Sequence, residues 1–138
     1  MKTFEWLDYL KLAIDFKEHI KEDDPMAEAL YRTSISRSYY FVFHYSQDYL
    51  QLLGITFKKT PNVHKEVCKV LEDLSKKENN YKISKDLKEI SVDLERLRTL
   101  RNKADYDEYM KNIRKETETS LIISKNIKEI VEKLKTFK

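Results

Sequence analysis

The stretch at residues 83–97, ISKDLKEISVDLERL, places its apolar side chains at Ile83, Leu87, Ile90, Leu94 and Leu97. The spacing alternates between four and three residues, which is the period of one face of an α-helix that packs against other helices. Most of the intervening residues are charged or small and polar. The stretch therefore predicts a long amphipathic helix, which needs partner helices to bury its apolar face.

Two helical segments are predicted before Gly54. The first has Thr3 as its cap and apolar side chains at helical spacing from Phe4 to Ile14. The second begins at Asp24-Pro25, where Asp24 suits the N-cap and Pro25 suits the first helical position. It ends near Leu53, because the only glycine of the chain, Gly54, can adopt the left-handed conformation that terminates helices.

Thr60-Pro61 repeats this signature and opens a third helix, which is followed by a polar loop at Lys76–Asn80. Beyond residue 97 the long amphipathic pattern breaks at Ala104–Asp107, and a last helix runs from about Glu108–Lys111 to Lys135. Short links between long amphipathic helices place neighbours antiparallel. We therefore expect an all-α fold, an up-and-down bundle of four to five helices, in a single domain over residues 1–138.

The composition excludes several classes of protein. One glycine and two prolines among 138 residues cannot supply the turns of a β-sandwich or barrel, or a glycine-rich phosphate loop. The single cysteine, Cys68, excludes a disulfide framework and fits a reducing compartment. The sequence contains no run of 18 apolar residues, and its first residues lack the apolar core of a signal peptide. We expect a cytoplasmic protein that has no membrane partner.

The charge is unevenly distributed along the chain. Residues 1–57 hold 6 Lys/Arg and 9 Asp/Glu, whereas residues 58–138 hold 21 and 15. A basic half can meet nucleic acid, but it can equally be a set of lysine-rich solvated helix faces. The three histidines show no metal-ligand spacing, so neither a metal nor another cofactor is expected.

Arg101 is the sharpest anomaly in the pattern. It lies four residues after Leu97, where the apolar seam calls for another leucine. A charge on an apolar face must be paired or must open onto a cleft. Arg101 at a helix end, near Asp105 and Tyr106, is suited to gripping a phosphate. The alternative is an Arg101–Asp105 pair that pins the loop.

A second group of candidate residues lies on the aromatic helix before Gly54. Arg37 and His44 are seven residues apart and therefore share one face of this helix. Arg37 is a candidate phosphate ligand and His44 a candidate proton carrier. The alternative for His44 is a core histidine that simply satisfies its hydrogen bonds.

Two segments together resemble the HEPN superfamily, in particular its small stand-alone bacterial and archaeal members. Residues 36–44, SRSYYFVFH, followed by LQLLG at residues 50–54, are similar to the group's SRxYYxxFH…LLxxG helix. Residues 97–107, LRTLRNKADYD, are similar to its LRxxRxxADYD segment. The resemblance covers about residues 25–115.

The resemblance implies a helical bundle that dimerises and brings two motif loops into one cleft. Many members are metal-independent endoribonucleases and toxins, often encoded beside a minimal nucleotidyltransferase that acts as antitoxin. Their motif is an Arg followed, after four to six residues, by a His; here Arg101 matches the Arg, but Tyr106, Asp107 and Glu108 occupy the His positions. A tyrosine with a pKa near ~10 is a poor proton shuttle at neutral pH.

The resemblance thus predicts a dimeric protein that binds RNA or nucleotide phosphate in a toxin–antitoxin or defence module with a nucleotidyltransferase. Arg101, Arg37, Asn102 and Asp105 form the predicted phosphate site. If the protein cleaves RNA, Arg101, His44 and Tyr106 are the predicted catalytic groups. The alternative is a non-catalytic interaction scaffold with a degenerate motif.

Overall fold

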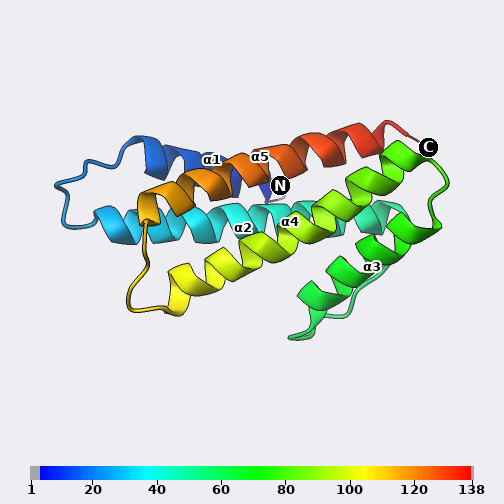
Figure 1. Cartoon of the computed structure of the whole chain (residues 1–138), viewed down its shortest axis with the longest axis horizontal. Coiled ribbons are helices and arrows are strands. Elements are labelled where there is room, and N and C mark those ends of the chain that lie inside the picture. Colours follow the sequence, from blue (N-terminus) through cyan, green and yellow to red (C-terminus); the bar gives the residue numbers. More distant parts are fainter. Residues whose placement is uncertain (1–3, 138) are drawn as a thin grey trace.

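The computed structural model describes residues 4–137, which form five helices (Figure 1). Their bounds are α1 Leu7–Glu18, α2 Ala27–Leu52, α3 Val63–Lys77, α4 Tyr81–Tyr106 and α5 Ile113–Lys135. No strand occurs within the described range, so the expected all-α helical bundle is confirmed. The predicted cap Thr3 lies outside the described residues.

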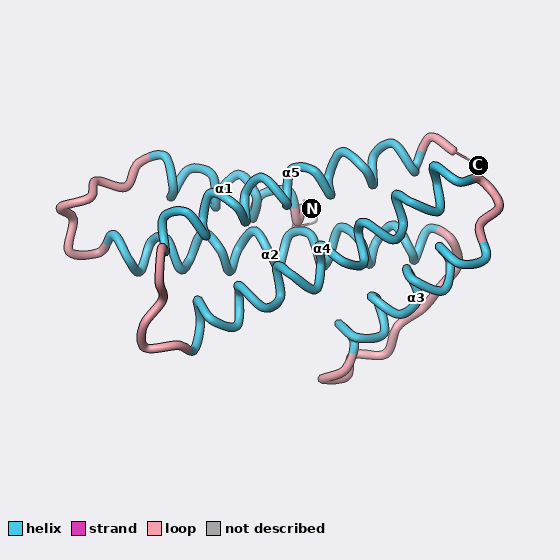
Figure 2. The backbone as a smooth tube through the Cα atoms, viewed as in Figure 1, coloured by secondary structure: helices cyan, strands magenta, loops and turns pink. Residues whose placement is uncertain are grey.

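Helix α2 is the centre of the bundle and packs on α1, α4 and α5 (Figure 1). Its run of aromatic and β-branched residues leaves apolar side chains on most of its faces, so several neighbours are needed to cover them. Ile35, Phe41 and Leu50 are fully buried as a result. Helix α3 packs mainly on α4, at the edge of the bundle, and the α2–α3 connection doubles back beside it (Figure 2).

The glycine and the two prolines lie at helix boundaries, as predicted. Gly54 has φ +89°, and the amides of Gly54 and Ile55 donate to the carbonyls of Gln51 and Leu50, at 3.0 and 3.2 Å. This pair of hydrogen bonds is the Schellman motif, which satisfies carbonyls that the end of a helix leaves unpaired.

The predicted starts of the helices that follow the prolines are two residues early. The side chain of Asp24 accepts a hydrogen bond from the amide of Met26, and that of Thr60 accepts one from the amide of Asn62. Each forms a turn just before its helix instead of capping it, so α2 begins at Ala27 and α3 at Val63.

The prediction of a break at Ala104–Asp107 is wrong, because α4 continues through Tyr106. Ala104 is a favourable helix residue, and it is buried against Ile35 and Met110. The connection runs over residues 107–112 and ends at Asn112, the one non-glycine residue with positive φ (56°) in the part of the chain described.

Three smaller differences concern helix ends. Helix α1 begins at Leu7, so Phe4 precedes it and is exposed. Helix α3 extends through Lys77, which shortens the predicted loop to residues 78–80. Helix α5 starts at Ile113, slightly later than predicted.

In the described range, none of the helices is both long enough and apolar enough to cross a bilayer.

Candidate functional site: a guanidinium group on a tyrosine shelf

Arg101 lies on the inward face of α4, one turn beyond the buried Leu97, and points toward α2. Its Nη2 donates to the hydroxyl of Tyr40 at 2.8 Å, and its Nη1 donates to the side-chain oxygen of Asn102 at 2.6 Å. Its Nε is buried and makes no hydrogen bond, although an Asp105 carboxylate oxygen lies 3.5 Å away. The side chain is 18% exposed, so this charge reaches solvent from a largely enclosed position.

Two tyrosine rings of α2 form a shelf beneath the charged groups. The guanidinium carbon of Arg101 lies 5.3 Å from the ring centre of Tyr39 and 5.1 Å from that of Tyr40. Arg37 lies 5.1 Å from the same Tyr40 ring and 4.8 Å from the ring of Tyr9 in α1. These distances are typical of cation–π contacts, which hold guanidinium planes in place while their donor edges stay available.

The positive charge of this cluster exceeds its negative charge. Among the described residues, Asp105 is the carboxylate within ion-pair distance of Arg101, and Arg37 has none within 4.0 Å. Two guanidinium groups lie over the Tyr40 ring, and one carboxylate is paired with them. The remaining net positive charge is suited to binding an anion.

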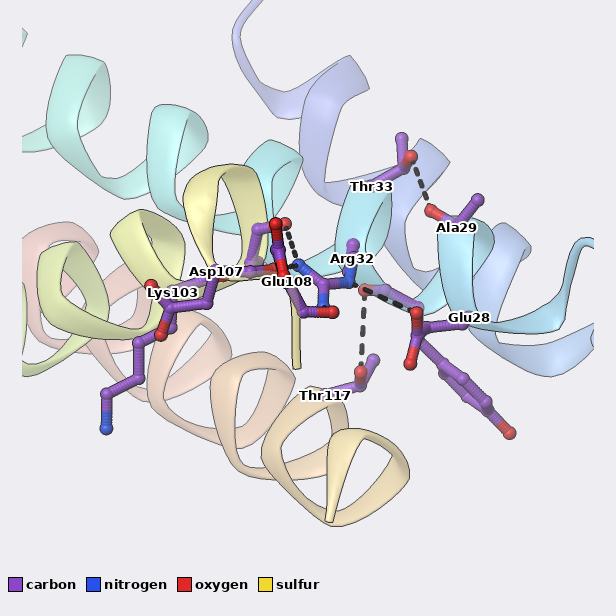
Figure 3. A network of polar contacts seen from close by, with 10 residues as sticks. Glu28, Ala29, Arg32, Thr33, Lys103, Asp107, Glu108 and Thr117 are labelled. Carbon is purple, nitrogen blue, oxygen red and sulfur yellow. Dashed lines mark hydrogen bonds and ion pairs between the residues drawn. The ribbon is translucent and has the colours of Figure 1, made fainter. Parts of the chain in front are cut away.

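The end of α4 beside this cluster is held by a residue that the sequence patterns did not single out. The guanidinium of Arg32, from α2, donates to the carbonyl oxygens of Ala104 at 2.9 Å and Asp107 at 2.6 Å, with longer contacts to Lys103 and Glu108 (Figure 3). The last carbonyls of a helix have no partner within the helix. Arg32 supplies partners for two carbonyls of the last turn and for the two carbonyls that directly follow the helix, so α4 ends without a glycine or a proline.

The connection after α4 is also anchored by apolar contacts. Met110 is buried and forms a small cluster with Ile35 and Ala104, against which Leu100 and Ile113 pack. Because Leu100 and Ala104 flank Arg101 on α4, this cluster and the Arg32 contacts fix the helix turn that carries Arg101.

Two of the predicted catalytic residues are not in contact with Arg101. His44 lies one turn beyond Tyr40 on α2 and stacks on Trp6, with ring centres 3.6 Å apart and planes 7° from parallel. Burial lowers its pKa. Tyr106 is 76% exposed, and its hydroxyl forms no hydrogen bond within residues 4–137. The structure therefore brings together Arg101, Arg37, Asn102 and Asp105 but leaves His44 and Tyr106 apart from them.

The histidine connected to this cluster is His64, at the start of α3. Its Nδ1 lies 2.6 Å from the hydroxyl of Tyr39, and its Nε2 lies 3.1 Å from a carboxylate oxygen of Glu95. The Sγ of Cys68, one turn along α3, lies 3.5 Å from the same Nε2. Burial lowers the pKa of His64 despite the hydrogen bond with Glu95, and Arg98 and Arg101 lower it further.

Two of the three groups around His64, the Cys68 thiol and the Tyr39 hydroxyl, are also in their neutral forms. Burial raises the pKa of Cys68 to about 12, so the thiol is protonated and is a poor nucleophile. Burial also raises the pKa of Tyr39 far above its ordinary value, although Arg101 opposes this shift. The sequence offered one signal for this cluster, the four-residue spacing of His64 and Cys68, but Glu95 comes from another helix and could not be placed beside them.

Neither the curated proteins nor the solved structures contained a match to this chain. A family model described as HEPN domain matches residues 7–134, from the first residue of α1 almost to the end of α5. The match includes the tyrosine shelf, Arg101 and the Arg32 contacts, so it covers the helices that build the site as well as their connections. On the extent of this match, the chain belongs to the HEPN domain family.

Proposed function

We propose that this HEPN domain binds a phosphate of RNA or of a nucleotide through Arg101 and Arg37. The observation that carries the proposal is the pair of guanidinium groups on the Tyr40 ring, which has a single carboxylate within reach. Arg101 has a buried Nε without a hydrogen bond, and an incoming phosphate oxygen is an acceptor that could draw its donor edge outward. Asn102 and Asp105 orient the guanidinium in the unliganded protein.

The proposed role is binding rather than catalysis of RNA cleavage. Cleavage through the ribose 2′-hydroxyl needs a group within hydrogen-bond reach that can accept a proton near neutral pH. His44 is stacked on Trp6, and His64 faces Tyr39 and Glu95. We further propose that the protein works as a homodimer, with a nucleotidyltransferase-type partner, in a toxin–antitoxin or defence module.

The test is equilibrium binding of labelled single-stranded RNA, and separately of a labelled nucleoside triphosphate, measured by fluorescence anisotropy. Arg101→Ala should weaken binding about 10- to 100-fold, because it removes a charge-assisted hydrogen bond to the phosphate. For RNA, the slope of log K against log salt should fall by about 0.7 for each phosphate that the variant no longer neutralises. The matched control is Arg114→Ala, which removes the same charge from the start of α5, where Arg114 pairs with Glu22 and Glu118.

Equal losses of affinity in Arg101→Ala and Arg114→Ala would show that only general charge matters, and the absence of saturable binding would refute the proposal. Gel analysis of the same RNA detects any cleavage. If the wild-type protein cleaves the RNA and Arg101→Ala does not, the function is endoribonuclease activity instead of binding alone. Light scattering coupled to size exclusion tests the dimer.

A second candidate function is a non-catalytic scaffold, which is favoured by the contacts that Arg101 makes within its own chain. In a scaffold, Arg101→Ala should lower the free energy of unfolding by several kcal/mol, because it leaves Tyr40 and Asp105 without their partner. In a phosphate site, the loss of stability should be small and the loss of ligand affinity large. Urea unfolding and anisotropy on the same variant separate the two.

A further inference from the structure

His64, Cys68 and Glu95 place three metal-binding atoms around one point between α3 and α4. The imidazole Nε2, the thiol Sγ and a carboxylate oxygen all lie within 4.8 Å of one another. Among the described residues, this is the one such group of three His, Cys, Asp or Glu side chains. We propose that these side chains bind a divalent cation of the Zn²⁺ class, with a water molecule as the fourth ligand.

Two of the three separations between the donor atoms match those around a tetrahedral ion. Zinc–nitrogen and zinc–oxygen bonds near 2.0–2.1 Å and zinc–sulfur bonds near 2.3 Å require about 3.6 Å between N and S and about 3.3 Å between N and O. The structure has 3.5 Å between His64 Nε2 and Cys68 Sγ, and 3.1 Å between Nε2 and the Glu95 oxygen. The third separation, between Cys68 Sγ and the Glu95 oxygen, is within 4.8 Å, whereas a tetrahedral ion needs about 3.6 Å, so the exposed Glu95 side chain must move toward the sulfur for ligation.

The surroundings of His64 suit a metal ligand. A ligating imidazole usually has its other nitrogen held by a hydrogen bond, which fixes the orientation of the ring. Here the Tyr39 hydroxyl lies 2.6 Å from Nδ1, so Nδ1 can carry the proton and donate it to Tyr39 while Nε2 faces the ion. The imidazole is buried, so its position is set by packing as well as by this bond.

Charge and access are consistent with the same proposal. Binding breaks the S–H bond of Cys68, its proton leaves to water, and the sulfur forms a bond to the ion. His64 Nε2, which donates to the Glu95 carboxylate in the metal-free protein, gives up its proton while Nδ1 takes one from water, so the tautomer changes and the imidazole stays neutral. The resulting thiolate and the Glu95 carboxylate together neutralise a divalent cation, while His64 stays neutral. A surface groove lined by both Cys68 and Glu95 gives the ion a path from solvent.

The mixed N, S and O ligand set selects the class of metal. Thiolate and imidazole favour Zn²⁺ and its relatives over Mg²⁺ or Ca²⁺, which prefer oxygen ligands alone. Two ligands come from α3 and one from α4, so the ion would join the outermost helix to the rest of the bundle (Figure 1). Its role would be to hold α3, and with it the Tyr39 side of the shelf, in place.

The experiment titrates the chelator-treated full chain with Co²⁺, whose spectrum reports ligand type and geometry. We expect one ion per chain, a thiolate-to-cobalt charge-transfer band and the intense visible bands of tetrahedral Co²⁺, all of which Zn²⁺ should displace. Zn²⁺ should also raise the melting temperature. An octahedral spectrum without a charge-transfer band would overturn the proposal.

Variants identify the ligands individually. Cys68→Ala should abolish the charge-transfer band, and Glu95→Gln should keep the band while weakening Co²⁺ binding at least about tenfold. Glu95 is exposed, so its replacement leaves folding intact. The matched control is Glu72→Gln, which removes a carboxylate from the same groove and should leave binding unchanged.

Equal losses of Co²⁺ affinity in Glu72→Gln and Glu95→Gln, or full affinity in Cys68→Ala, would refute the site. Arg101→Ala should leave the Co²⁺ spectrum unaltered, which separates this proposal from phosphate binding.

Discussion

Replacing Arg32 with methionine tests whether the end of α4 depends on a side chain from α2. The change keeps most of the length of the side chain and removes its donors. Two of the four hydrogen bonds from Arg32 to main-chain carbonyls, at 2.6 Å to Asp107 and 2.9 Å to Ala104, have the length of strong hydrogen bonds. Bonds to a charged group contribute about 1.5–3 kcal/mol each, and part of this is recovered when water reaches the carbonyls. We expect the free energy of unfolding to fall by about 3 kcal/mol.

The assay is urea unfolding followed by circular dichroism, combined with hydrogen exchange of the amides of residues 104–112. Exchange should accelerate in this segment and remain unchanged in α3, because the hydrogen bonds of Arg32 are local to the end of α4. Arg114→Met is the matched control, since Arg114 is more exposed and bonds to side chains instead of helix carbonyls. A fall in stability below about 1 kcal/mol with unchanged exchange in residues 104–112 would refute the capping role.

Three further outcomes follow from the structure. Gly54→Ala should cost about 1–2 kcal/mol in urea unfolding, because φ is +89° and strain is the sole penalty, with no atom within 4 Å of the added methyl. Ile35→Ala should cost about 3 kcal/mol and loosen the connection that Met110 anchors, as proteolysis would report; a stable, protected variant would contradict this. Burial lowers the folded-state pKa of His44 below about 6.5, so the unfolded chain binds more protons between the two pKa values. Its contribution to stability is therefore complete above pH 6.5 and lost as the pH falls through the folded pKa; the fluorescence of Trp6, the single tryptophan, should titrate with it, and His44→Gln should remove both effects.

The helix pattern could be predicted because it depends on local chemistry. The seam from Ile83 to Leu97 reports which face of α4 is buried, and Gly54 reports where α2 ends. The end of α4 could not be located in this way. Two carbonyls of its last turn and the two that follow it accept hydrogen bonds from Arg32, 71 to 76 residues earlier in the chain, and no local signal records such a partner.

Part of the candidate site could be predicted from the sequence, because that part also depends on local patterns. Arg101 breaks a periodic pattern, and Asp105 follows at the spacing of an i, i+4 pair, so both can be recognised from the sequence alone. The contact between Arg101 and Tyr40 joins two helices and becomes visible only when they are packed. The surroundings of His44 and His64 could not be predicted from the sequence. Their positions in the sequence do not reveal that His44 meets Trp6, or that His64 meets Tyr39 and Glu95.

The hydrogen bonds of Arg32 all go to main-chain carbonyls, and this has a consequence for how the protein can change (Figure 3). A carbonyl oxygen is present whatever side chain its residue carries. Substitutions at Lys103, Asp107 or Glu108 therefore leave the support of the helix end in place. The segment beside Arg101 can vary in charge and shape while its backbone stays fixed, so new ligand preferences can arise there without loss of the fold.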